Sequence, residues 1–191
     1  GRYQRGRGEA ELNKQENQDW ARQCLAGFDP HPGMLMKTAL ALSVDQNPEF
    51  RLNPAMDILT MLIGRLARLR DCEAPATLDD AVYVINQILM DDCGFSAEDS
   101  REQTPQAACV GEMLLRHSGH PAALAILYLQ AARTLGVKGS AIDFPGHYLL
   151  RLDYAGTRTI VDPRAGGIQR NAANLRGLLK SVLGLDRELA R

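Results

Sequence analysis

The sequence lacks the features of secreted and membrane-spanning proteins. Its 191 residues contain no uninterrupted apolar run of about 18 residues, the length that a membrane-spanning helix needs, and its first residues lack the apolar core of a signal peptide. The four cysteines form no C-x-x-C pair, which argues against a zinc knuckle or a thioredoxin motif. We therefore expect a cytoplasmic protein with reduced thiols. The cysteines are Cys24, Cys72, Cys93 and Cys109.

An excess of charge of one sign is also missing. The formal net charge is −1 at pH 7, so neither nucleic acid nor an anionic membrane surface is expected as the principal partner. Arginines and glycines are frequent at the start, but the run is short and poor in aromatic residues, which favours a flexible tail over residues 1–20 rather than an RNA-binding segment. Residues 21–191 are long enough for one domain with a sizeable core.

Helical periodicity dominates residues 33–118. Asn53 is expected to cap one helix, with Pro54 at its first position, and Thr77 is expected to cap the next. A polar loop is expected over residues 96–104. The helices are predicted at residues 34–44, from Asn53, from Thr77, and at residues 105–117.

The stretch from Arg116 to Gly167 has the most specific order of elements. A helix is predicted to open at Pro121, because proline loses no hydrogen bond at the first helical position, and to stop at Gly136. Three β-like runs follow, separated by turn signals, and Asn171 or Asn174 is expected to cap a final helix that packs on the sheet or on a partner. The runs are residues 139–144, 147–152 and 157–161.

The last two runs predict a hairpin that orients a histidine. If residues 153–156 form a tight turn, His147 lies directly across from Asp162, close enough for the carboxylate to accept a hydrogen bond from the imidazole. A slip of one residue would place the two side chains on opposite faces. The same register pairs Arg151 with Arg158, an unfavourable neighbour.

A helix start followed by a strand histidine and a strand aspartate resembles the layout of papain-like and transglutaminase-like cores. In those cores a cysteine at the helix start is the nucleophile, the histidine is its base and the aspartate orients the ring. The resemblance places a glycine fifteen residues after the cysteine and an alanine four residues after it. Counted back from Gly136, this position is Pro121, with Ala125 four residues later. The nucleophile position is therefore occupied by proline.

That substitution is found in one branch, and the chain resembles the bacterial Sir B type transglutaminase-like family, a domain also found in a eukaryotic F-box protein. The resemblance covers roughly residues 36–170. The chain departs from the family at Ala123, where a hydroxyl residue is usual, at Arg164, where an aromatic is usual, and at Ala107 or Ala108, where an asparagine is usual. The residues that carry the family motifs are Gly119, Pro121, Tyr128, Gly136, Pro145, Gly146, His147, Asp162, Pro163 and Gly167.

The resemblance implies an α+β fold, with a helical half packed on a small antiparallel sheet. Its parts are expected at about residues 33–118, 119–167 and 171–185. No residue is assigned a catalytic role with assurance, because His147 and Asp162 lack a local nucleophile. No cofactor is expected. Metal binding by His117 and His120 is disfavoured, since no strong ligand signature accompanies them.

Two functions remain open from the sequence. The first is a non-catalytic transglutaminase-like domain, a regulatory or protein-interaction module whose partner is another protein. The second is a cysteine-dependent hydrolase or acyltransferase in which Cys93 or Cys109 is a displaced nucleophile beside His147 and Asp162. The second requires a sulfur within hydrogen-bond reach of His147 and an unusually acidic thiol.

Overall fold

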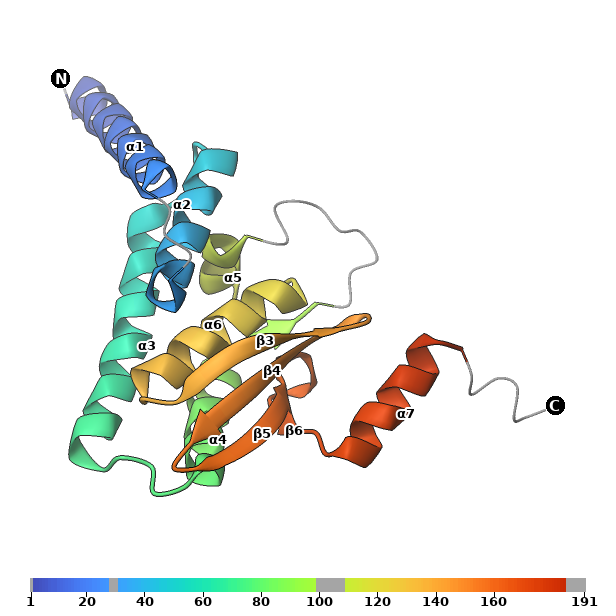
Figure 1. Cartoon of the computed structure of the whole chain (residues 1–191). Coiled ribbons are helices and arrows are strands. Elements are labelled where there is room, and N and C mark those ends of the chain that lie inside the picture. Colours follow the sequence, from blue (N-terminus) through green and yellow to red (C-terminus); the bar gives the residue numbers. More distant parts are fainter. Residues whose placement is uncertain (1, 28–30, 99–108, 185–191) are drawn as a thin grey trace.

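The computed structural model describes residues 2–27, 31–98 and 109–184 (Figure 1). It confirms the α+β class, since a helical half packs on a small antiparallel sheet. Among the described residues, no helix is long and apolar enough to cross a bilayer. The helices are α1 (Arg2–Ala26), α2 (Leu35–Gln46), α3 (Leu52–Cys72), α4 (Leu78–Asn86), α5 (Val110–Arg116), α6 (Pro121–Thr134) and α7 (Ala172–Val182), with shorter helical segments η1 (Pro32–Met34), η2 (Gln87–Asp92) and η3 (Pro163–Ala165).

The main sheet is an antiparallel meander. Its strands lie in the order β3, β4, β5, β6, so each pairs with its neighbour in the sequence and β3 is an edge strand. A separate two-stranded parallel pair, β1 with β2, joins the end of η2 to the start of α6. The sequence predicted only a loop at β1, because two residues carry no periodicity. The strands are β1 (Ser96–Ala97), β2 (Ser118–Gly119), β3 (Lys138–Phe144), β4 (His147–Tyr154), β5 (Thr157–Asp162) and β6 (Ile168–Gln169).

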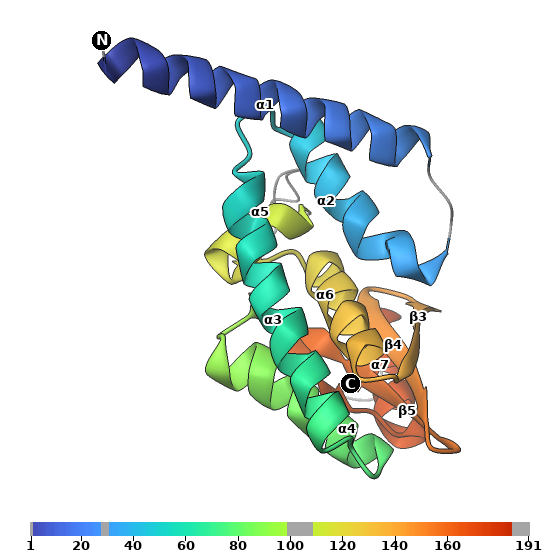
Figure 2. The same ribbon diagram turned by 90° about the vertical axis from the view of Figure 1, so that its left-hand side faces the viewer.

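Helix α6 is the central element of the core. Figure 2 shows it between α3 and the sheet. Apolar or small residues face both neighbours, and Ala123, Leu124 and Tyr128 are completely buried. Helix α3 contacts α6, and Leu62 and Leu66 of α3 are buried. Because α6 is fixed from both sides, its N-terminal end is held in a defined position beside the sheet.

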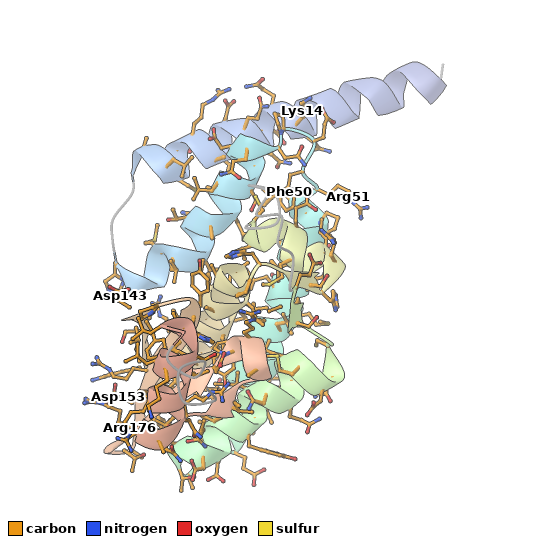
Figure 3. The ribbon with its side chains drawn as sticks, turned by 90° about the vertical axis from the view of Figure 1, so that its right-hand side faces the viewer. Lys14, Phe50, Arg51, Asp143, Asp153 and Arg176 are labelled. Carbon is orange, nitrogen blue, oxygen red and sulfur yellow. The ribbon has the colours of Figure 1, made fainter. Side chains whose placement is uncertain are left out.

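A second packing point lies where α2, α3 and α5 meet. Phe50, from the loop that joins α2 to α3, is buried there (Figure 3). Gly111 of α5 lies against its ring, and a Cβ at this glycine would overlap the ring. The N–H of Gly111 donates to Ser43 Oγ of α2 at 3.1 Å. The close approach of α5 therefore depends on a residue without a side chain.

Two of the predicted helix starts illustrate success and failure. Thr77 caps α4 as predicted, since its hydroxyl accepts from the Asp80 N–H at 3.1 Å and its own N–H donates to the Asp80 carboxylate at 2.9 Å. The prediction that Asn53 caps α3 is wrong. The helix begins at Leu52, so Pro54 lies within the first turn, where a missing N–H costs no hydrogen bond.

The ends of the chain differ most from expectation. The structure has a helix, α1, over most of residues 1–20, where the sequence predicted a flexible tail, and its last turns pack on α2 through Ala21 and Cys24. Asn171 caps α7 as predicted. No residue of α7 is buried, so the sheet does not cover this helix, and its packing on a partner stays a prediction. Of the helix predicted at residues 105–117, α5 is the described part, and Ala107 and Ala108 lie outside the described residues.

Candidate functional site

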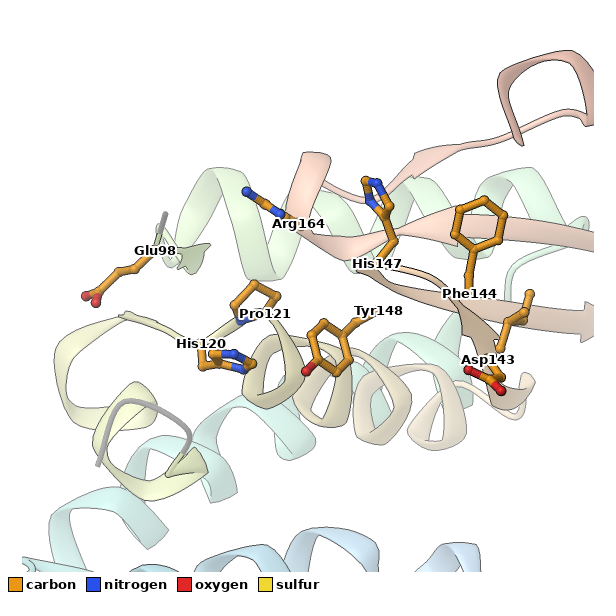
Figure 4. Close-up of a pocket in the computed structure, with 10 residues that line it drawn as sticks. Glu98, His120, Pro121, Asp143, Phe144, His147, Tyr148 and Arg164 are labelled. Carbon is orange, nitrogen blue, oxygen red and sulfur yellow. The ribbon is translucent and has the colours of Figure 1, made fainter. Parts of the chain in front are cut away.

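A groove with a volume of about 380 Å³ opens at the N-terminal end of α6 (Figure 4). We call it the Pro121 groove. His120 and Pro121 form one side, His147 and Tyr148 of β4 form another, and Arg164 of η3 lies beside them. The structure therefore brings together the helix start and the strand histidine, two of the positions that the family resemblance singled out.

The predicted pairing of His147 with Asp162 is wrong. Ring atom Nδ1 of His147 is buried and has no hydrogen-bond partner among the described residues. Asp162, which is 2% exposed, accepts hydrogen bonds from Arg170 Nη2 at 2.7 Å and Nε at 3.2 Å, and from the Ala165 N–H at 3.3 Å. Asp162 thus anchors η3 and the chain after β6, and it does not orient the histidine.

The register of the hairpin explains this difference. The turn contains only Ala155 and Gly156, both with positive φ, and Tyr154 pairs with Thr157. Positive φ at both central residues is the signature of the type I′ turn that suits two-residue hairpins. Relative to the prediction, the pairing is shifted by two residues, which keeps side chains on the expected faces but moves them along the strand.

In the observed register Arg151 and Arg158 do not lie opposite each other, so the unfavourable arginine pair does not form. Arg158 lies opposite Asp153, and Arg158 Nε donates to Asp153 Oδ1 at 2.6 Å. Arg151 Nε lies 3.3 Å from the other oxygen of the same carboxylate. The hydrogen bond from Arg158 lowers the pKa of Asp153 below its ordinary value.

The backbone N–H groups at the start of α6 are all used. Pro121 has none, and the Ala122 N–H donates to His120 Nδ1 at 3.1 Å. The N–H groups of Ala123 and Leu124 both donate to the His120 carbonyl oxygen, at 2.9 and 3.2 Å. Acyl transfer requires donors aimed at the oxyanion that forms on the substrate. The helix start therefore offers neither a nucleophile nor a free backbone donor.

None of the four cysteines, all of which are described, lines the Pro121 groove. Cys109 is buried, and its Sγ donates to Gln46 Oε1 at 3.2 Å. Burial raises the pKa of the Cys109 thiol, and burial likewise raises the pKa of Cys93, although Arg65 acts in the opposite direction. A reactive cysteine needs a lowered pKa, so both thiols have the properties of packing residues.

His117 and His120, whose pairing as metal ligands the sequence disfavours, both have structural partners. His117 takes the left-handed conformation at the end of α5, its Nδ1 lies 2.6 Å from the Cys93 carbonyl oxygen, and its ring stacks on Phe95 at 4.6 Å. His120 caps α6 and meets Tyr148 edge-on at 5.4 Å. Within the described ranges, no group of three or more histidine, cysteine or acidic side chains is placed to hold a metal ion.

Several family-motif residues serve the fold near the groove. The Tyr128 hydroxyl donates to Asn86 Oδ1 at 2.8 Å, and Asn86 Nδ2 donates to the Gly167 carbonyl oxygen at 3.0 Å. Gly167 has a φ of 74°, and a Cβ there would overlap the Asn86 side chain. This chain of contacts joins α6, α4 and the loop after η3. Sequence reasoning missed Asn86, because nothing in a helical pattern marks a half-buried amide that bridges two other segments.

Glu98 is a groove residue that the sequence did not identify. It follows β1, and its carboxylate accepts from Arg116 Nη2 at 2.9 Å and from Ser118 Oγ at 2.7 Å. Its N–H donates to the Gly119 carbonyl oxygen at 2.8 Å, which extends the pairing of β1 with β2. Its position depends on a parallel pairing that no local pattern reveals.

Comparison with known proteins finds a matching family model and several similar bacterial proteins. A family model described as the transglutaminase-like superfamily matches residues 56–191. A "UPF0162 protein" of Xylella fastidiosa is 27% identical over 160 residues, which are 84% of this chain and 56% of the relative. One of Pseudomonas aeruginosa is 28% identical over 166 residues, or 87% of this chain and 59% of the relative. The chain thus spans just over half the length of these bacterial relatives.

A eukaryotic protein also matches. The "F-box only protein 21" of Mus musculus is 31% identical over 93 residues, which are 49% of this chain and 14% of that protein. No solved structure matches the chain.

Proposed function

The chain belongs to the transglutaminase-like superfamily, and from this membership we propose that it is a non-catalytic member of the Sir B type, a regulatory or interaction module whose Pro121 groove binds another protein. The observation that carries the proposal is the start of α6. Proline occupies the position where the family resemblance places the nucleophile, and the neighbouring N–H groups are already hydrogen-bonded within the helix cap.

The contacts of His147 and Asp162 support the same proposal. A histidine acts as a general base when a third group orients its ring and a nucleophile lies within hydrogen-bond reach. Asp162 is bonded to Arg170 instead, and Pro121 has no proton to give. The helix start and His147 therefore line one groove without the nucleophile and the orienting carboxylate that triad chemistry needs.

The alternative, an enzyme with a displaced cysteine, finds no support in the position of the thiols. Neither Cys93 nor Cys109 lines the Pro121 groove, and burial raises the pKa of both. Activation of either would require a rearrangement that brings its sulfur to His147 and removes it from its packing site.

The groove has features that suit a protein partner. Tyr148 is 46% exposed at its edge, and tyrosine and arginine side chains carry much of the affinity in protein interfaces. We extend the proposal to a bacterial cytoplasm, which the bacterial relatives and the free thiols support.

Photo-crosslinking tests the proposal. The photoreactive residue p-benzoylphenylalanine replaces Tyr148 in one variant and Tyr83, an exposed tyrosine of α4, in a matched control. Each variant is irradiated in a bacterial extract, and covalent adducts are identified by mass spectrometry. The proposal expects one defined protein crosslinked at the first position and not at the second. Adducts that are absent from both positions, or the same at both, would contradict it.

A further inference from the structure

A second cavity, of about 410 Å³, lies at the opposite end of β3 from the turn that borders the Pro121 groove. We call it the Lys138 cavity. Its lining is mainly apolar and comes from three segments: Leu35 and Met36 at the start of α2, Ile126 and Leu129 of α6, and Val137 before β3. An apolar side chain or a small apolar group would be removed from water there.

The ionisable groups that line this cavity are all basic. They are His31, Arg133 and Lys138, and in the described part of the chain neither Arg133 nor Lys138 forms an ion pair or a side-chain hydrogen bond. The guanidinium of Arg133 packs over Gly33, where a Cβ would overlap it, so the absence of a side chain at Gly33 leaves room for the charge at the rim. The cavity therefore suits a ligand that has an apolar body and a negative group beside it.

The exposed edge of β3 begins at this cavity. β3 has β4 on one side and, within the described ranges, no strand on the other. Phe144 pairs with His147 across a two-residue turn, so this pair exchanges hydrogen bonds and alternate residues do the same along the ladder. By that alternation the N–H of Ala141, an exposed residue, points away from β4. Such an edge accepts an added strand.

We propose that the β3 edge and the Lys138 cavity together bind the carboxyl-terminal segment of another protein. The segment forms a strand antiparallel to β3, places an apolar last side chain in the cavity and sets its terminal carboxylate beside Arg133 and Lys138. This goes beyond the proposed function, because the surface is separate from the Pro121 groove.

Two observations select a chain terminus and its direction. A strand that follows the edge toward Lys138 meets the segment from His31 to Met36, which forms the far wall of the cavity, so the added strand ends there. Basic groups at that end attract a carboxylate and repel an ammonium group. The added chain therefore ends, rather than begins, at Lys138, which makes it antiparallel to β3.

The test uses a fluorescein-labelled peptide, Gly-Ser-Thr-Val-Thr-Val-Leu, with a free carboxylate, and the same peptide with a terminal amide. Fluorescence anisotropy is expected to show saturable binding of the first and a loss of about tenfold in affinity for the amide, since a charged hydrogen bond is removed. Arg133→Gln and Lys138→Gln should each weaken binding by about threefold to tenfold. Lys180→Gln, the same charge change on exposed α7, should leave binding unchanged.

Ala141→Pro tests the added strand itself. Proline removes the outward N–H and leaves the bonds to β4 in place, so peptide affinity should fall at least about tenfold while the circular dichroism spectrum and thermal midpoint are retained. Equal binding of the carboxylate and amide peptides, or no saturable binding with Leu, Val or Phe as the last residue, overturns the proposal. So does a concentration-dependent dimer that Ala141→Pro disrupts while no peptide binds, because the edge would then pair with a second copy.

Discussion

At the scale of single residues, the start of α6 has no nucleophile and no backbone N–H left to bind a ligand. His120 accepts from Ala122 through its side chain and from Ala123 and Leu124 through its carbonyl oxygen, and Pro121 has no donor. A helix N-terminus usually lowers the pKa of a thiol and binds anions through its free N–H groups. Here those N–H groups donate to His120 and stabilise the helix cap, so the helix start contributes to the stability of the fold and not to ligand binding.

The thiols of Cys93, which is half-buried, and Cys109, which is buried, should be unreactive. Because burial raises the pKa of Cys93 and Cys109, we expect both to react with iodoacetamide more slowly than free N-acetylcysteine at pH 8, and their rates to rise toward a higher pH. Exposed Cys72 is the internal control. Peptide mass spectrometry over a range of pH measures each rate. Fast modification of Cys93 or Cys109 at neutral pH would contradict the account.

The ion pair of Asp162 with Arg170 should stabilise the folded chain. Asp162→Asn leaves Arg170, whose side chain is 19% exposed, without its charged partner, and we expect a loss of about 2–3 kcal/mol in the free energy of unfolding. Urea denaturation measures this loss. In the double variant with Arg170→Gln the further loss should be small, whereas additive losses would show that the two residues act independently.

At the scale of elements, local signals predicted helix ends well and strand register poorly. Thr77, Pro121 and Gly136 mark helix boundaries through their own backbone chemistry, and the structure places them as expected. The sequence does not predict the β4–β5 turn, because a positive φ at Ala155 is uncommon for a residue with a side chain. Tyr154 stays in the strand, where its hydroxyl donates to the Pro75 carbonyl oxygen at 2.8 Å, a contact too distant in sequence to predict.

The β4–β5 hairpin should be sensitive to pH through Asp153. The Arg158 hydrogen bond holds its pKa below the ordinary value of 3.8, so the ionised carboxylate stabilises the folded chain above that pH, and the contribution disappears as pH falls through the folded pKa. Asp153→Asn should therefore lower the denaturation midpoint slightly at about pH 6, with a difference from the parent that vanishes toward about pH 2. A difference that is constant with pH would contradict this.

At the scale of the whole molecule, the sequence predicted the class and the central order of elements but not the surroundings of the site. The helix, hairpin and turn around His147 follow from periodicity and turn residues, whereas Glu98 and Asn86 reach their partners through β1–β2 pairing and packing between α4 and α6. Long-range contacts of this kind leave no local pattern. The family resemblance singled out Pro121 and His147, and the structure shows which residues surround them and how they are hydrogen-bonded.

The terminal helix α7 is a weakly attached element. None of its residues is buried, and Val182 lies beside the turn between β3 and β4, where a Cβ at Gly146 would be 3.6 Å from it. A chain that ends at Arg170 keeps the Asp162 ion pair and should unfold cooperatively, with a free energy of unfolding within about 1 kcal/mol of the parent. Calorimetry measures this. Loss of a cooperative transition would show that α7 belongs to the core.

The most direct test of the central claim is an acyl-protein trapping experiment followed by mass spectrometry. The chain and a His147→Ala variant are mixed with excess p-nitrophenyl acetate at neutral pH, and intact mass is followed with time. The account predicts no adduct whose formation depends on His147, because Pro121 cannot act as a nucleophile and the cysteines lie outside the groove. Rapid, stoichiometric acylation of a cysteine that is lost in His147→Ala would contradict it and establish an enzyme.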